Sequence, residues 1–448
     1  MDYFKNYFLT CLRFTNKVFS LSASVLGVLV FSLFILPIAG KAEEFGIQFG
    51  GYVRNDLFYD TRMNEGVRDN MLLFYPKNVE LNSDGKDINE KPSLYWSNLA
   101  TRINAKISAP DFLKAKTIGF IEAEFVGQSD QQTNVMRLRH AYIDLDWGIS
   151  KLTIGQTWNP MFVLETMPMN LALTAGAPVT PLVRNPQIKY QHRFTKDIYA
   201  SITAMSQRDF TSTGPNGFST EYQRYAIIPA FNLQLKYKST DGSLVFGAGA
   251  EYKTLRPYNE FEVVSSTGDR QKHSVTTNVT SLATNVFFGV NAEPVNIRLG
   301  AWYGGNMADF LMAGGYGIAE YASDGTPSKY TNFNNASGML DVSFSLSQKV
   351  KIGAFVAANK NLGTTDEILV SNPYWARAKD IDLIYRISPR ITYQIHKLQF
   401  GLEYEYTGAN YGKTREFIDA DKTTWKGKWS ETNDVNNSRI LLATTLFF

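Results

Sequence analysis

Hydrophobic and polar residues alternate along most of this chain, in segments of about ten residues. The clearest segments are 231–238, with the sequence FNLQLKYK, and 398–407, with the sequence LQFGLEYEYT. Successive side chains of a β-strand point to opposite faces of the sheet. These segments are therefore predicted strands with one apolar face and one polar face.

Sixteen segments of the sequence follow this pattern, and the last one ends on the terminal Phe448. Their ranges are 47–59, 99–107, 117–126, 135–147, 152–158, 187–194, 198–207, 228–238, 244–255, 279–291, 295–304, 338–346, 350–359, 382–395, 398–407 and 438–448. The links after even-numbered segments are brief. The links after odd-numbered segments are mostly long, as in 61–92, 159–186, 256–276, 307–332 and 408–437.

This parity of link lengths is typical of outer-membrane barrels, which alternate short periplasmic turns with long outer loops. A closed barrel can cross a bilayer because it leaves no backbone group unpaired. We therefore predict an all-β fold, a transmembrane antiparallel up-and-down β-barrel of about 16 strands. A β-helix or a propeller has a similar spacing of strands and is the alternative.

The first 42 residues have the order of a secretory signal peptide. Lys5, Arg13 and Lys17 precede an apolar run, 21–38, and the small residues Gly40 and Ala42 follow it. This order predicts a signal peptide over 1–42 and a barrel over 43–448. A membrane anchor is the alternative, since 18 apolar residues can just span a bilayer.

Composition narrows the classes of function. The only cysteine lies within the predicted signal peptide, which excludes disulfides and zinc-thiolate sites from the mature chain. The 45 basic and 42 acidic residues give no basic field of the kind that nucleic acid requires. Charged residues make up 19%, below the quarter typical of soluble proteins, so a large apolar surface is expected.

No pattern in the sequence predicts catalysis, a cofactor or a metal. Of the four histidines only His140 stands beside other candidate residues, and no serine or acid lies at a spacing that suggests a triad. Segment 80–91 partly imitates a calcium loop, but Lys91 stands where a bidentate acid is required. A looser calcium site in the same segment, through Asp84, Asp87 and Glu90, is the alternative.

The third long link, 159–186, is unusually apolar for a loop that faces water. Its only charged residues are Glu165 and Arg184, and it contains five prolines. We expect it to fold into the barrel and to set the narrowest width of a pore. The alternative is a surface loop that is buried at a contact between subunits.

The polar phase of the predicted strands places more basic than acidic side chains toward the lumen. A mildly basic channel concentrates anions, unless these residues pair across strands and leave no net field. In segment 135–147 the alternation fails after Arg139, which a β-bulge or a subunit contact would explain. The candidate pore-lining and constriction residues are Arg102, Glu122, Glu124, Arg137, Arg139, Glu165, Arg184, Lys189 and Arg193.

Two short motifs carry a resemblance to a known family. Residues 137–142, RLRHAY, and residues 152–158, LTIGQTW, resemble the corresponding stretch of DcaP-like porins, with a fainter likeness to phosphate-selective porins. The resemblance implies a trimeric barrel that passes small anions such as dicarboxylates, with Arg137 and Arg139 near its constriction. DcaP-like proteins carry a periplasmic helical extension before the barrel, whereas here the first predicted strand begins within a few residues of the predicted cleavage site.

We therefore expect a porin of the bacterial outer membrane that admits small hydrophilic solutes by passive diffusion. Weak anion preference is expected, with dicarboxylates or phosphate as candidate solutes. The expected partners are outer-membrane lipid, lipopolysaccharide and two further copies of the chain in a homotrimer. The alternative function is a surface scaffold or adhesin barrel with little conductance.

Overall fold

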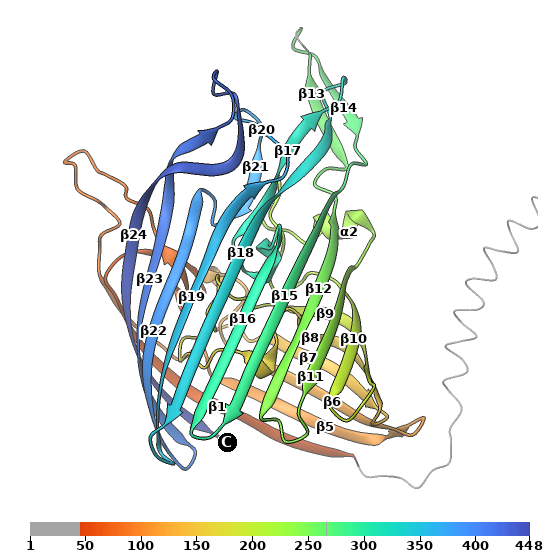
Figure 1. Ribbon diagram of the computed structural model, residues 1–448, viewed down its shortest axis with the longest axis vertical. Coiled ribbons are helices and arrows are strands. Elements are labelled where there is room, and N and C mark those ends of the chain that lie inside the picture. Colours follow the sequence, from red (N-terminus) through yellow and green to blue (C-terminus); the bar gives the residue numbers. More distant parts are fainter. Residues whose placement is uncertain (1–44, 266) are drawn as a thin grey trace, which may run out of the picture. The chain divides into compact units, whose positions relative to one another are not determined.

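The computed structural model describes residues 45–265 and 267–448. Within these residues, sixteen wall strands form one closed antiparallel β-barrel (Figure 1). The predicted fold class is thus confirmed. The predicted signal peptide, 1–42, lies outside the described residues.

The wall strands pair with their sequence neighbours around the barrel, as expected for an up-and-down topology. They are β1 (Gly46–Asp60), β5 (Arg102–Phe112), β6 (Ala115–Glu124), β7 (Arg137–Asp146), β8 (Ser150–Trp158), β9 (Arg184–Arg193), β10 (Ile198–Met205), β11 (Ala230–Lys238), β12 (Leu244–Leu255), β15 (Val279–Ala292), β16 (Val295–Gly305), β18 (Pro327–Ser345), β19 (Val350–Thr364), β22 (Ile381–Ile395), β23 (Leu398–Phe417) and β24 (Thr424–Phe447).

The barrel closes between its first and last strands. β1 pairs with β24 from Tyr52 opposite Phe447 to Asp60 opposite Arg439. At the upper end of this seam the buried Arg439 guanidinium lies 2.8 Å from the Asp60 carboxylate. The closure leaves no unpaired sheet edge, which a lipid environment would penalise.

The two faces of the wall differ in polarity as the alternation predicts. On β11, Phe231 and Leu233 are 41% and 59% exposed on the outside, whereas Asn232 and Gln234 are buried inside. Apolar side chains on the outer face and polar ones on the inner face reverse the order of a soluble protein. The outer face is therefore suited to hydrocarbon.

Additional elements lie in the long outer connections, where the sequence pattern predicts loops. They are β2 (Asn64–Val67), β3 (Leu72–Pro76), β4 (Ser93–Ser97), β13 (Glu260–Val264), β14 (Arg270–Ser274), β17 (Gly314–Tyr321), β20 (Ile368–Leu369), β21 (Tyr374–Arg377), α2 (Glu221–Ala226) and the 3-10 turns η1 (Asp130–Gln132), η2 (Leu164–Thr166) and η3 (Ala308–Phe310). Among the described residues, no helix is long and apolar enough to cross a membrane.

The predicted loop 408–437 is wrong, because β23 and β24 continue through most of it as a long hairpin. Likewise β17 and the start of β18 occupy much of the predicted loop 307–332. Beyond the bilayer neither face of a strand meets lipid, so the alternation that marks a membrane strand is lost.

The wall has a low side and a tall side (Figure 1). We call β5 to β11 the low side, where each strand has 8 to 11 residues. We call β18, β19, β22, β23 and β24 the tall side, where each strand has 15 to 24 residues. This difference positions the site described below.

Candidate functional site

The connection between β8 and β9 lies inside the barrel. We call it the inner loop; it comprises residues 159–183, because β9 already begins at Arg184. The Asn159 side chain bonds to Glu251 on β12, and the Trp302 indole of β16 donates to the Met161 carbonyl at 3.1 Å. The loop therefore crosses from the low side toward the opposite wall.

The far end of the inner loop is fixed to the tall side. The Glu403 carboxylate on β23 accepts hydrogen bonds from the backbone of Leu171 at 2.7 Å and of Ala172 at 3.2 Å. Leu171 also packs against Gly401, where an added Cβ would lie 2.4 Å from the Leu171 side chain. Glycine at this wall position makes room for the loop.

Arg386 on β22 joins the inner loop to the first outer connection. Its fully buried guanidinium donates to the Ala177 carbonyl at 2.8 Å and to the Leu73 and Phe74 carbonyls at 3.0 Å. Buried carbonyls need such partners, since an unmade bond there costs about 1–3 kcal/mol. One side chain thus holds two loops within the lumen.

Apolar side chains of these loops and of the tall wall form one cluster inside the barrel. We call it the apolar cluster; its members include Leu72, Phe74, Met161, Phe162, Ala177, Val179, Leu182, Trp302, Phe310, Met339, Phe355 and Ile384. Closely packed apolar groups exclude water. The lumen beside the tall side is therefore filled.

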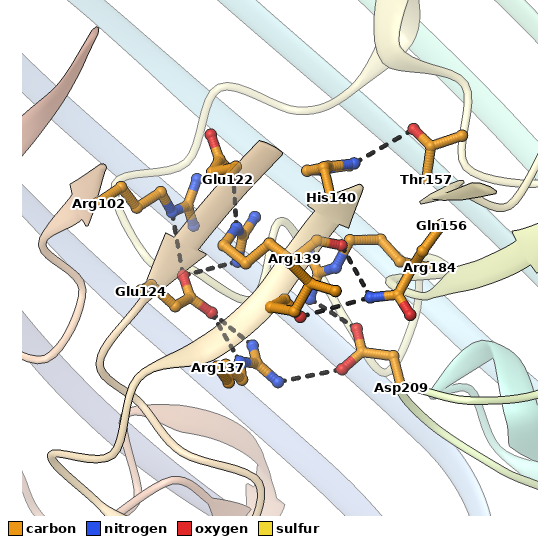
Figure 2. Close-up of polar contacts among 11 residues, drawn as sticks. Arg102, Glu122, Glu124, Arg137, Arg139, His140, Gln156, Thr157, Arg184 and Asp209 are labelled. Carbon is orange, nitrogen blue, oxygen red and sulfur yellow. Dashed lines mark hydrogen bonds and ion pairs between the residues drawn. The ribbon is translucent and has the colours of Figure 1, made fainter. Parts of the chain in front are cut away.

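Ionised side chains gather on the low side, between β5, β6, β7 and β9 (Figure 2). We call this group the charge cluster; its members are Arg102, Glu122, Glu124, Arg137, Arg139, Arg184 and Asp209. Six of the nine residues that the sequence predicts for the pore are brought together here.

Glu124 is the centre of the charge cluster and is only 2% exposed. Its two oxygens lie 3.0 Å from Arg102, 2.5 Å from Arg137 and 2.6 Å from Arg139. Several arginines around one carboxylate satisfy its lone pairs while their remaining N–H groups stay available to other acceptors.

Asp209 extends the cluster toward the outer side. Its carboxylate lies 3.0 Å from Arg137 and 2.6 Å from Arg184. Burial favours a higher pKa for Asp209, but Arg184, Arg137 and Arg139 outweigh it and hold the pKa below its usual range. The cluster thus contains four guanidinium groups and three carboxylates, a formal excess of one positive charge.

A β-bulge in β7 turns both predicted arginines into the lumen. In the pairing with β6, Glu122 faces His140 and Ala123 faces Leu138, so Arg139 is the extra residue. This is the phase change that the broken alternation of the sequence predicts. The carbonyl of Arg139 that the bulge leaves free accepts a hydrogen bond from Gln156 at 3.0 Å (Figure 2).

Trp158, at the end of β8, lies beneath the arginines. The Arg184 guanidinium stands 4.5 Å and that of Arg139 5.8 Å from the centre of its ring. Stacking of this kind fixes a guanidinium plane without using its N–H donors. Trp158 also packs against Phe162 of the inner loop, which connects the charge cluster to the loop.

Cavities lie above and below the charge cluster. An upper cavity of about 320 Å³, between outer connections, is lined by Arg68, Asp209, Phe210 and Arg377 among others. A cavity of about 20 Å³ lies among the cluster arginines themselves. A lower cavity of about 220 Å³ begins at Trp158. The space among the cluster arginines is therefore much smaller than the cavities above and below it.

The other three predicted residues, Glu165, Lys189 and Arg193, do not lie with the charge cluster. They line a fourth cavity, of about 490 Å³, which shares residues with the lower cavity and reaches the short turns at 194–197 and 239–243. Glu165 lies 2.6 Å from Lys236 on β11. Although burial favours a higher pKa for Glu165, Lys236 holds that pKa below its usual range.

Sequence reasoning missed Asp209 and Trp158 as members of the site. Asp209 follows β10 in an outer connection, 206–229, and no pattern there marks it as a partner of distant arginines. Trp158 belongs to the motif LTIGQTW, but the alternation of β8 alone gives it no role.

The environment of His140 is that of a structural residue. Its Nδ1 lies 3.2 Å from the Thr157 hydroxyl, and its ring packs against Trp158. Among the described residues, no group of three His, Cys, Asp or Glu side chains is arranged to hold a metal ion, and Asp84, Asp87 and Glu90 therefore do not form such a group.

Comparisons with known proteins agree with this architecture. The family described as DcaP outer membrane protein matches residues 36–242, which include β1 to β11. No curated protein matches the sequence significantly.

Solved structures match nearly the whole chain. The outer membrane channel DcaP of Acinetobacter baumannii is 16% identical with a TM-score of 0.63, and the match covers 92% of this chain and 100% of that one. The trimer form of OmpT of Vibrio cholerae is 11% identical with a TM-score of 0.51, covering 91% and 100%. An anion-selective porin from Comamonas acidovorans is 9% identical with a TM-score of 0.50, covering 90% and 100%.

At these low identities, the structural likeness establishes only the fold. The family match covers both sequence motifs, 137–142 and 152–158, and agrees with the resemblance that they indicate. The predicted outer-membrane location is confirmed. The chain therefore has the fold of outer-membrane porins, and over residues 36–242 it resembles the DcaP outer membrane protein family.

Proposed function

We propose that this porin passes small hydrophilic solutes by passive diffusion with a weak preference for anions. In this proposal the charge cluster and the inner loop form the narrowest part of the route. The observation that carries it is the position of the charge cluster between the upper and the lower cavity, on the one side of the lumen that the apolar cluster leaves polar.

Size and charge select the solute together. The inner loop narrows the lumen, and the excess positive charge of the buried cluster attracts anions through surroundings of low dielectric. Guanidinium groups bind carboxylates and phosphates through paired N–H donors, so dicarboxylates and phosphate are the candidate solutes. No turnover chemistry takes part.

The assembly that we propose is a homotrimer embedded in outer-membrane lipid and lipopolysaccharide. Its support is the trimer form of the structurally similar OmpT and the apolar outer face of the wall. The Comamonas acidovorans porin, which shares the fold, is described as anion-selective.

Charge reversal at the cluster tests this function. Replacing Arg137→Glu together with Arg139→Glu changes the formal charge of the cluster from +1 to −3. Reversal potentials across planar bilayers in a KCl gradient should then shift from anion preference toward cation preference. The control makes the same charge change at Arg270→Glu and Lys272→Glu, which lie 72% and 69% exposed on β14. An unchanged ratio in the cluster variant would overturn the proposal.

A second candidate function, a surface scaffold or adhesin barrel, is favoured by the apolar cluster and by the tall outer hairpins. Such a barrel would pass no measurable current. Single-channel recording of the wild-type protein separates the two functions directly.

A further inference from the structure

A second group of cations lies below the inner loop, apart from the charge cluster. We call the cavity of about 490 Å³ that they line the lower chamber. Its basic residues are Lys151, Lys189, Arg193, Lys196, Lys236 and Lys238. Two short turns form its rim, so it opens at the periplasmic end of the barrel.

Few carboxylates balance these cations. Lys151 pairs with Asp144 at 2.6 Å, and Glu165 serves both Lys236 at 2.6 Å and Lys238 at 3.8 Å. Within the described residues, the other three cations, Lys189, Arg193 and Lys196, form no ion pair with a carboxylate. Six cations thus share two carboxylates, an imbalance larger than that of the charge cluster.

The cations of the lower chamber face the lumen and not the lipid. On β9, Ile188 and Tyr190 are exposed on the outer face at 57% and 43%, so Lys189 between them points inward. A cation in this position meets solutes dissolved in the lumen and is turned away from lipid headgroups.

Glu165 reaches the lower chamber from the inner loop. It lies on η2, whose only acidic residue it is, and the loop carries it across to β11. Its carboxylate therefore stands where a carboxylate of a dissolved anion would bind the same lysines.

We propose that the lower chamber is a binding site for a small, multiply charged oxyanion, and that Glu165 competes with this anion as a tethered carboxylate. This proposal rests on the proposed function, which supplies the route by which anions reach the lower chamber. Binding itself requires no current, so it can be measured separately.

Multiple charge is favoured because the cations stand on several strands. Lys189 and Arg193 are four residues apart on one face of β9, a separation of about 13 Å along the strand. Lys236 lies on β11, beyond the intervening β10. An anion with two or three carboxylates can contact cations on different strands at the same time, whereas a single carboxylate contacts only cations that lie side by side, as Glu165 does with Lys236 and Lys238.

Calorimetric titration of citrate into the purified full-length protein in detergent at low salt tests the site. Glu165→Gln should tighten citrate binding by about threefold to tenfold, because it frees Lys236 and Lys238. Lys189→Gln together with Arg193→Gln should weaken binding by about tenfold or more. Acetate, with a single charge, should bind far more weakly than citrate to every variant.

The matched control is Lys351→Gln on β19, a lysine near the periplasmic end of another part of the wall that pairs with Glu293. It should leave citrate binding unchanged. Tighter binding in Glu165→Gln is a gain that misfolding cannot produce. Weaker or unchanged citrate binding in Glu165→Gln would overturn the proposal. So would equal citrate binding by the double variant, Lys189→Gln with Arg193→Gln, and by Lys351→Gln.

The outcome is also separable from that of the proposed function. If citrate does not bind while the Arg137 and Arg139 variant still reverses ion preference, the lower chamber is no site and the porin function stands. If citrate binds as expected and charge reversal changes nothing, the anion-selective constriction fails and the lower chamber stands.

Discussion

The low side and the tall side of this barrel use their inner faces differently. On the low side, short strands present arginines, lysines and carboxylates to cavities. On the tall side, long strands pack against loops through the apolar cluster, with a few buried polar groups such as Arg386 and Glu403 as anchors. One wall supports the loops while the other faces the open space.

This difference teaches where selectivity can arise in a wide barrel. A lumen enclosed by 16 strands is wide enough for water unless loops fill it. Here the loops fill one part, so under the proposed function a small number of charges on the remaining part would meet every solute that passes. The charge cluster can therefore act strongly although its formal excess is only one.

The largest effect is expected from releasing the loops on the tall side. Arg386→Met keeps an unbranched apolar stem but removes the donors to Ala177, Leu73 and Phe74. Because both loops then lose buried hydrogen bonds, single-channel conductance should rise by about twofold or more. The anion-to-cation permeability ratio should move closer to one.

Arg415→Met is the matched control, since Arg415 also lies on the tall side but stacks on Trp425, at the base of the β23–β24 turn. It should keep wild-type conductance. If Arg386→Met also keeps wild-type conductance, the tall side does not hold the loops in place, and the contrast between the low side and the tall side is wrong.

A smaller effect is expected from Glu124→Gln on the low side. The change raises the formal excess of the charge cluster from one to two, so the anion-to-cation permeability ratio should rise, on the order of twofold. Three arginines also lose their shared carboxylate, so the barrel should unfold at a lower temperature.

Glu122→Gln makes the same change of charge but removes a contact to Arg139 alone. It should alter selectivity without a comparable loss of thermal stability, measured by the mobility shift of heated samples on gels. Equal destabilisation by both variants would contradict the central position assigned to Glu124.

The smallest effect is expected from salt. The Debye length falls from about 10 Å at 0.1 M to about 3 Å at 1 M. The anion preference measured from reversal potentials should therefore weaken as KCl is raised, though the buried cluster is screened only in part. If the anion preference does not change with KCl concentration, the width of the route and not its charge would select the solutes.

Much of the barrel could be predicted from the sequence, because each membrane strand faces lipid on one side and the lumen on the other. That local constraint imposes the period of two from which sixteen strands, their inward faces and the parity of their links were predicted. The sequence also indicated the bulge at Arg139 as one explanation of the broken alternation within that strand.

The outer parts of the strands were not predictable in this way. The upper halves of β23 and β24 lie beyond the lipid and carry polar residues on both faces, although Tyr411, Trp425 and Val435 are buried there, so no regular alternation marks them as strands. Their pairing with each other, which the local sequence does not encode, forms the long hairpin.

By itself, the sequence determined a closed barrel in the outer membrane and the set of charged side chains on its inner face, because period and burial are properties of neighbouring residues. Only the tertiary structure decided which of these charges meet. It placed Asp209 beside Arg137 and Arg184, separated Glu165 and Lys189 into the lower chamber, and joined Arg386 to loops more than two hundred residues away. Such contacts depend on the closure of the barrel, which brings distant segments together in space.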